Sequence, residues 1–143
     1  MKSLKNAIED RETFDAATRD CVALIESEVA SKSGLSGMAI KAGFATLRGL
    51  RPGFLEHVVR GLLPEFAGAI DPIAAEATGD VEQHLVANAG RVADALLAIT
   101  DAKAERSQNR AAKSAYGRLR GSAKQHVEAV VPRLAELIVR YAR

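Results

Sequence analysis

Apolar side chains recur every three or four positions along almost the whole chain, which is the spacing of one face of an amphipathic helix. The first such stretch covers residues 14–29 and ends in a polar, glycine-containing segment that begins at Ser31. We expect Ser36 to cap a second helix. That helix should end near Gly49, because the residue before Pro52 disfavours helical geometry.

The remainder of the chain continues the helical pattern. Pro52 suits the first turn of a third helix, and Pro64 should kink that helix or restart it. Asp80 follows a Thr-Gly pair and is expected to cap one long helix across residues 81–99. A polar break at residues 107–109 then precedes a last helical region that reaches the C-terminus. Because no alternating, β-branched run is present, we predict an all-α protein.

Length and composition fit one globular unit. A chain of 143 residues with 48% hydrophobic and 27% charged side chains predicts a single helical domain over residues 1–143, a bundle of about five to seven helices. One cysteine excludes a disulfide framework. No run approaches the roughly 18 apolar residues of a membrane span. The charged N-terminal region does not resemble a signal peptide, so we expect a cytoplasmic protein.

Charge is segregated along the chain. Residues 32–61 carry a net charge of +4, residues 62–102 carry −6, and residues 103–124 carry +6. Such blocks either pair with one another in the fold or form faces of opposite sign.

The sequence matches itself when it is shifted by 72 positions. Residues 41–62 then fall on residues 113–134, and each segment contains a consecutive Leu-Arg-Gly triplet. The match extends over residues 17–64 and 89–136, which predicts two similar helical units related by a pseudo-two-fold axis. The alternative is coincidence between alanine-rich amphipathic helices.

Two kinds of segment are candidates for binding an anion. The glycine- and serine-rich segment 32–41 could offer free backbone amides at a helix start, or could simply be a tight turn between helices. In each proposed repeat a lysine, an aromatic residue and an arginine lie three and four positions apart, close to one helix face. These paired faces could hold phosphates or stack a base, or the aromatic rings could belong to the core. The candidate anion-binding residues are Lys32, Ser33, Ser36, Lys41, Arg48, Lys113, Tyr116 and Arg120.

The sequence offers little for catalysis. His57, His84 and His126 are far apart and show neither a zinc-protease nor a zinc-finger spacing. Cys21 lies within an apolar stripe, which favours an inert, buried thiol. We therefore predict no catalytic residue, no metal site and no cofactor.

Four segments carry a resemblance: KSGLSGMAIKAG, RPGFLEHVVRGLLPEF, LLAITDAKAERS and KSAYGRLRG. Together they resemble an uncharacterised family of small, all-helical bacterial proteins. The resemblance implies an all-helical single domain and carries over no activity, cofactor or site residue.

The leading functional hypothesis is a non-enzymatic, cytoplasmic helical protein that acts through protein–protein contact or self-association. The alternative is a protein that binds phosphorylated ligands or nucleic acid through the paired lysine, aromatic and arginine faces. Such binding should weaken steeply with salt. An enzyme that uses Glu56 or a histidine is a third and weaker hypothesis.

Overall fold

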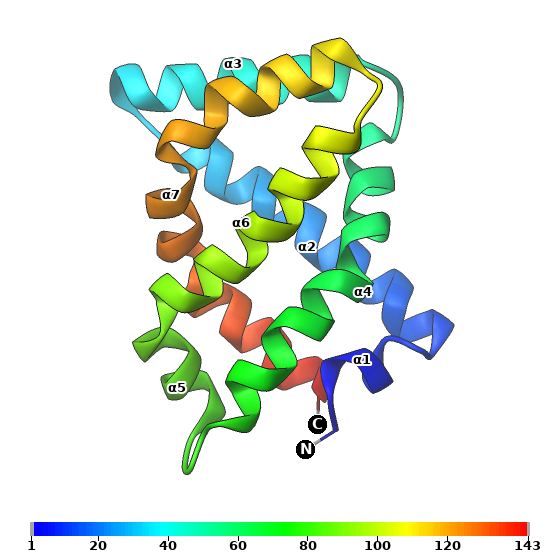
Figure 1. Ribbon diagram of the computed structural model, residues 1–143, viewed down its shortest axis with the longest axis vertical. Coiled ribbons are helices and arrows are strands. Elements are labelled where there is room, and N and C mark those ends of the chain that lie inside the picture. Colours follow the sequence, from blue (N-terminus) through cyan, green and yellow to red (C-terminus); the bar gives the residue numbers. More distant parts are fainter. Residues whose placement is uncertain (1, 143) are drawn as a thin grey trace.

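The computed structural model describes residues 2–142, which form seven helices and no strand (Figure 1). The helices are α1 (Leu4–Ala7), α2 (Arg11–Ser31), α3 (Gly34–Gly49), α4 (Phe54–Ala75), α5 (Val81–Ala87), α6 (Ala89–Arg106) and α7 (Arg110–Ala142). The all-α prediction and the expected number of helices are confirmed. No helix within this described part of the chain is both long and apolar enough to cross a membrane.

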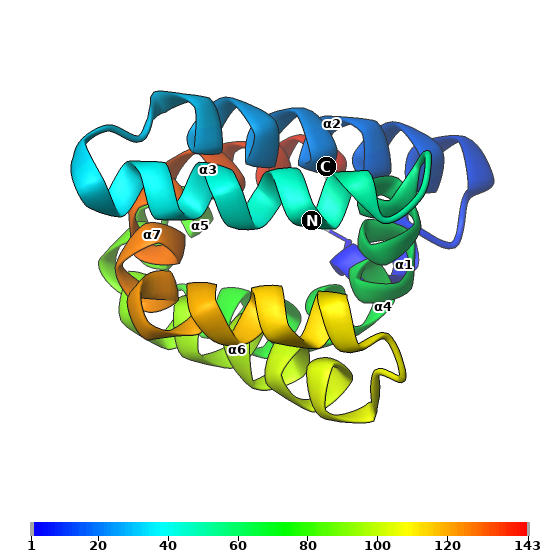
Figure 2. The same cartoon turned by 90° about the horizontal axis from the view of Figure 1, so that it is seen from above.

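The helices are arranged in two layers. Figure 2 shows α2 and α3 side by side in one layer, with α6 and the first part of α7 in the other. Helix α4 contacts elements of both layers, and α7 packs against α3, α5 and α6. The two ends of the chain meet, because the backbone N–H of Lys2 donates to the carbonyl of Ala142 at 2.8 Å.

The most closely packed core lies between α4, α5, α6 and the second part of α7. Leu85, Val92 and Val131 are each 1% exposed at its centre. Helix α1 covers one side of this core through Leu4. The Asp71 carboxylate of α4 fixes α1 in place, since its oxygens accept the backbone N–H groups of Leu4 at 2.7 Å and Lys5 at 3.1 Å. This carboxylate serves the otherwise unpaired amides at a helix start.

Helix α3 begins earlier than the sequence predicted. Ser33 and not Ser36 occupies the capping position, and the Ser33 side chain makes no capping hydrogen bond. The reason lies in two glycines. Gly34 has a φ of +73°, which favours glycine, and a Cβ on Gly37 would lie 2.7 Å from the carbonyl carbon of Lys32. The chain therefore turns tightly here, as the turn interpretation of residues 32–41 expects.

The prediction of one long helix over residues 81–99 is wrong, because the helical run is interrupted at Asn88 and forms the two helices α5 and α6. The Asn88 side-chain amide donates to the His84 carbonyl at 2.8 Å. Asparagine competes in this way with the regular helical hydrogen bonds of its neighbours. The start of the helix is confirmed, since Asp80 accepts the backbone N–H of Gln83 at 3.0 Å.

The prediction for Pro52 is wrong, whereas for Pro64 the structure favours a kink over a restart of the helix (Figure 1). Pro52 precedes α4 instead of lying in its first turn, and Gly53 has a φ of +72° at the capping position. Pro64 does not restart the helix, because α4 continues through it. Figure 1 shows that α4 and α7 both change direction along their length. A proline within a helix removes one hydrogen bond and bends the axis.

Helix α3 and the first part of α7 lie against each other. A Cβ on Gly43 would approach the Leu119 side chain to 2.9 Å, so the glycine permits this close crossing. The shift of 72 positions places α3 on residues 106–121, which include the start of α7. A loop separates α3 from α4, whereas α7 runs on without a break. The proposed duplication stays a prediction.

The acidic block of residues 62–102 forms ion pairs with the basic block of residues 103–124. Three ion pairs join residues 62–102 to residues 103–124. They are Glu65–Lys103 at 3.5 Å, Asp94–Lys124 at 3.0 Å and Asp101–Arg120 at 2.8 Å. Of the two alternatives for the charge blocks, internal pairing therefore applies to three of the seven cations in residues 103–124.

Candidate functional site

Two adjoining cavities occupy the space between the helical layers. The larger has a volume of about 240 Å³ and the smaller of about 160 Å³. Leu62 and Thr100 line both, so the two cavities lie next to each other and are bordered by these two side chains. An engineered apolar cavity of about 150 Å³ stays dry and binds benzene, so spaces of this size can hold an apolar molecule.

The larger cavity is enclosed by apolar side chains from α2, α4, α6 and α7, with Leu4 and Ile8 closing it near the N-terminus. The Tyr141 hydroxyl and the Cys21 thiol on its wall are not free to act on a ligand. The Tyr141 hydroxyl donates to the Asp20 carboxylate. Burial raises the pKa of the Cys21 thiol to about 11, so this thiol stays protonated at neutral pH and is a poor nucleophile. The cavity therefore offers volume and apolar surface.

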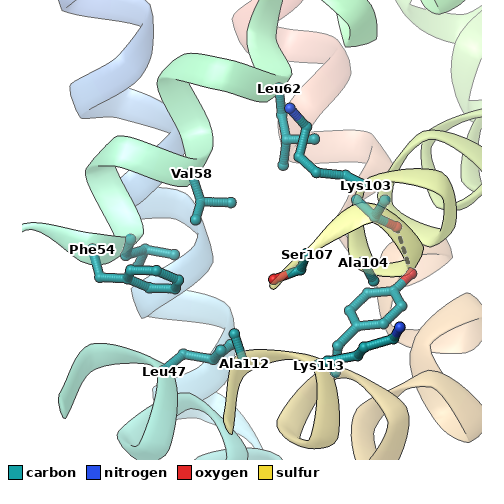
Figure 3. A pocket seen from close by; sticks show the side chains of 12 residues that line it. Leu47, Phe54, Val58, Leu62, Lys103, Ala104, Ser107, Ala112 and Lys113 are labelled. Atoms are coloured by element: carbon teal, nitrogen blue, oxygen red, sulfur yellow. Dashed lines mark hydrogen bonds between the residues drawn. The ribbon is translucent and has the colours of Figure 1, made fainter. Parts of the chain in front are cut away.

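The smaller cavity has charge at its edge. Figure 3 shows Phe54 and Val58 of α4 facing Ser107 at the end of α6 across an open space, with two lysines beside it. Lys103 and Lys113 are the charged residues among those that line this cavity. Lys103 pairs with Glu65, whereas the Lys113 ammonium donates only to the Glu105 carbonyl, at 3.3 Å. The positive charge of Lys113 is therefore left without a carboxylate partner among the described residues.

A hydrogen-bonded cluster fixes one wall of the smaller cavity. The Tyr116 hydroxyl donates to Asp101 Oδ1 at 2.6 Å and lies 2.6 Å from Thr100 Oγ1. Arg120 Nε donates to the same carboxylate oxygen at 2.8 Å. These bonds from Arg120 and Tyr116 lower the pKa of Asp101, while burial and the bond to Asp101 raise the pKa of Tyr116 to about 12. The cluster holds the Tyr116 ring against the cavity and ties α6 to α7.

The structure disperses most of the residues predicted to bind an anion. Lys32 and Ser33 form the junction between α2 and α3, where Lys32 lies 3.4 Å from Glu28. Ser36, Lys41 and Arg48 are exposed on α3 and line neither cavity. Lys113 and Tyr116 line the smaller cavity, while Arg120 does not line it and donates to Asp101. The two lysine, aromatic and arginine faces thus do not surround one cleft.

Sequence reasoning missed the cavities and most of their walls. Lys103 was visible only as a member of the basic segment 103–124. The apolar lining residues, such as Phe54 and Leu62, look like ordinary core positions in the sequence. Whether such side chains meet or leave a space depends on how far the helices diverge.

Comparisons with known proteins assign the chain to a family and leave its activity open. Within the described part of the chain, no three histidine, cysteine or acidic side chains are grouped so that they could hold a metal ion. Neither a curated protein nor a solved structure matches the chain. A family model covers residues 4–142, so nearly the whole chain takes part in the match. The resemblance seen in the sequence is thereby confirmed, and the chain belongs to the family of unknown function DUF6918.

Proposed function

We propose that this protein binds an amphipathic small molecule with an unbranched apolar chain and one anionic head group, such as a medium-chain carboxylate. The adjoining cavities carry the proposal. The larger one would take the chain among aliphatic side chains, and the smaller one would place the head group near the Lys113 ammonium. Burial of each methylene contributes about 0.8 kcal/mol, so a chain of several carbons suffices for measurable affinity.

This proposal keeps the anionic ligand of the sequence-based hypothesis but places its binding site at the smaller cavity. An anionic ligand was expected on the Lys41 and Arg48 face and on the Lys113 and Arg120 face. Arg120 already serves the Asp101 carboxylate and Lys103 pairs with Glu65. Of the two lysines that line the smaller cavity, Lys113 is therefore the one without a carboxylate partner among the described residues. Action through protein contact or self-association stays a prediction, as does contact with phosphorylated ligands or nucleic acid through the paired faces.

The proposal is one of binding without catalysis. Three hydroxyl and thiol groups near the ligand space are already bonded or protonated: Tyr116 and Tyr141 donate to carboxylates, and Cys21 is a neutral thiol at pH 7. Because their pKa values are raised, these groups stay protonated at neutral pH and cannot act as bases or nucleophiles there.

Calorimetry and thermal shifts with three ligands of equal chain length test the proposal. Decanoate should bind best, decanol more weakly and decyltrimethylammonium weakest, each used below its micelle concentration. At 100 times its dissociation constant a ligand stabilises the folded state by about 2.7 kcal/mol, a shift of several degrees.

Two variants distinguish the contribution of the ligand's apolar chain to affinity from that of its head group. Lys113→Ala should weaken decanoate binding roughly fivefold and leave decanol unchanged, because a partly exposed ion pair is worth about 1 kcal/mol. Arg118→Ala is the matched control, since it removes the same charge from an exposed position of α7 that lines neither cavity. Equal affinity for all three ligands, or no binding of any of them, would refute the proposal.

A further inference from the structure

The outward face of α3 has an unusual composition for a helix on a protein surface. Lys41 is the only charged residue between positions 33 and 47. Ile40 and Gly43 face inward and are buried, whereas Leu35 and Met38 are 87% and 67% exposed. Surface helices normally turn charged and polar side chains outward. This helix instead exposes two large apolar side chains, which is typical of a face that a partner covers.

No other element within residues 2–142 covers this face. Figure 1 shows α3 at the upper end of the molecule, and Figure 2, seen from that end, shows no helix lying across it. Leu35 and Met38 are three positions apart and therefore lie on the same side of the helix. Residues Ala42 and Ala45 extend the exposed strip with small side chains.

The charged residues of α3 itself, Lys41 and Arg48, are of one sign. No aspartate or glutamate occurs between Glu28 and Glu56. Lys41, Arg48 and Arg51 make no ion pair within residues 2–142. Several cations of the other basic block, by contrast, are neutralised by carboxylates of the fold.

We propose that α3 docks on the surface of an anionic lipid bilayer. In this arrangement α3 lies in the plane of the interface, Leu35 and Met38 enter the boundary between head groups and acyl chains, and Lys41 and Arg48 contact lipid phosphates. Helices of this kind bind through buried apolar area together with attraction to anionic lipids. The inference goes beyond ligand binding in the cavities and does not depend on it.

Charge complementarity selects this partner over two others. A second copy that packed through the same face would bring Lys41 and Arg48 near the same cations of its partner, with no acidic residue of α3 to compensate. A nucleic acid would match the charge but would leave Leu35 and Met38 exposed to water. An anionic bilayer satisfies both the apolar side chains and the cations.

Flotation with lipid vesicles tests the inference. The protein should float with vesicles of equal parts phosphatidylcholine and phosphatidylglycerol, and not with phosphatidylcholine alone. The double variant Leu35→Ser, Met38→Ser should weaken binding about tenfold or more. Removing Lys41 or Arg48 by substitution with alanine should weaken it roughly fivefold each, and high salt should weaken it further.

Matched controls keep the result specific to α3. Val86→Ser removes an exposed apolar side chain from α5, and Arg118→Ala removes an exposed cation from α7. Both should float as the wild type does. Lys113→Ala should also float normally, so the failure of one proposal can be distinguished from the failure of the other.

Three results would overturn the inference. Equal losses in the Lys41, Arg48 and Arg118 variants would mean that net charge alone drives the contact. Unchanged flotation of the Leu35→Ser, Met38→Ser variant would indicate a surface that binds polyanions in general. A wild-type dimer in sedimentation velocity that becomes monomeric in the Leu35, Met38 variant would assign the face to a second copy.

Discussion

The substitution Ala17→Leu tests whether the larger cavity is an empty, ligand-ready space. Ala17 is 5% exposed on α2 and lines this cavity. Leucine adds three carbon atoms, and burial of each contributes about 0.8 kcal/mol. Ordering the leucine side chain costs about 0.5–1 kcal/mol. We therefore expect a gain in unfolding free energy of about 1.5 kcal/mol, or roughly 3–6 °C in Tm for a chain of this length.

Ala17→Leu should also weaken decanoate binding, since the leucine side chain would occupy part of the cavity volume that the alkyl chain of decanoate needs. Urea unfolding and calorimetry on the purified variant measure the two effects. Ala93→Leu is the matched control, because Ala93 is fully buried in α6 and lines neither cavity. Overpacking should destabilise that variant by about 1–3 kcal/mol. If Ala17→Leu were destabilised to a similar degree, the cavity would not have room for the side chain and the reasoning would fail.

Three further predictions concern the fold itself. Leu85→Ala should lower the unfolding free energy by about 2–5 kcal/mol in urea melts, because Leu85 is 1% exposed in the packed core; a loss below 1 kcal/mol would contradict the packing described. Gly68→Ala, in open space on α4, should raise stability by up to about 1 kcal/mol, whereas Gly43→Ala should gain less because its Cβ would meet Leu119 at 2.9 Å; equal gains would refute that contact. Burial lowers the pKa of His126, so the unfolded chain binds more protons, and stability should fall as the pH drops below about 6.5. Urea midpoints between about pH 7.5 and 5.5 should show this fall, and His126→Gln should flatten it.

The local elements could largely be predicted because their causes are local. Helical spacing of apolar residues, the Asp80 cap and the polar break at residues 107–109 each act within a few positions of the chain. The errors have local causes too, but ones in which two tendencies compete. Asn88 carries a side chain that either continues a helix or bonds its backbone, and Ser33 and Ser36 are equally good capping residues by type.

Of the candidate site, the sequence could predict two lining residues but not their arrangement, and the anionic ligand stays a prediction. The sequence pointed to lysines, Tyr116 and an anionic ligand, and Lys113 and Tyr116 do line a cavity. It could not show that Arg120 is held by Asp101, nor that Lys41 and Arg48 face away from that cavity on another helix. Side chains that share one helix face can still have different neighbours, because those neighbours come from distant parts of the chain.

By itself, therefore, the sequence determined an all-helical chain with a segregated charge pattern and membership of one family. The tertiary structure alone decided where the helices pack closely and where they leave space. The spacing of apolar residues sets which side of a helix turns inward, but the distance between two helices depends on all the side chains between them. Leu85 and Leu62 look alike in the sequence, yet one fills the core and the other lines both cavities.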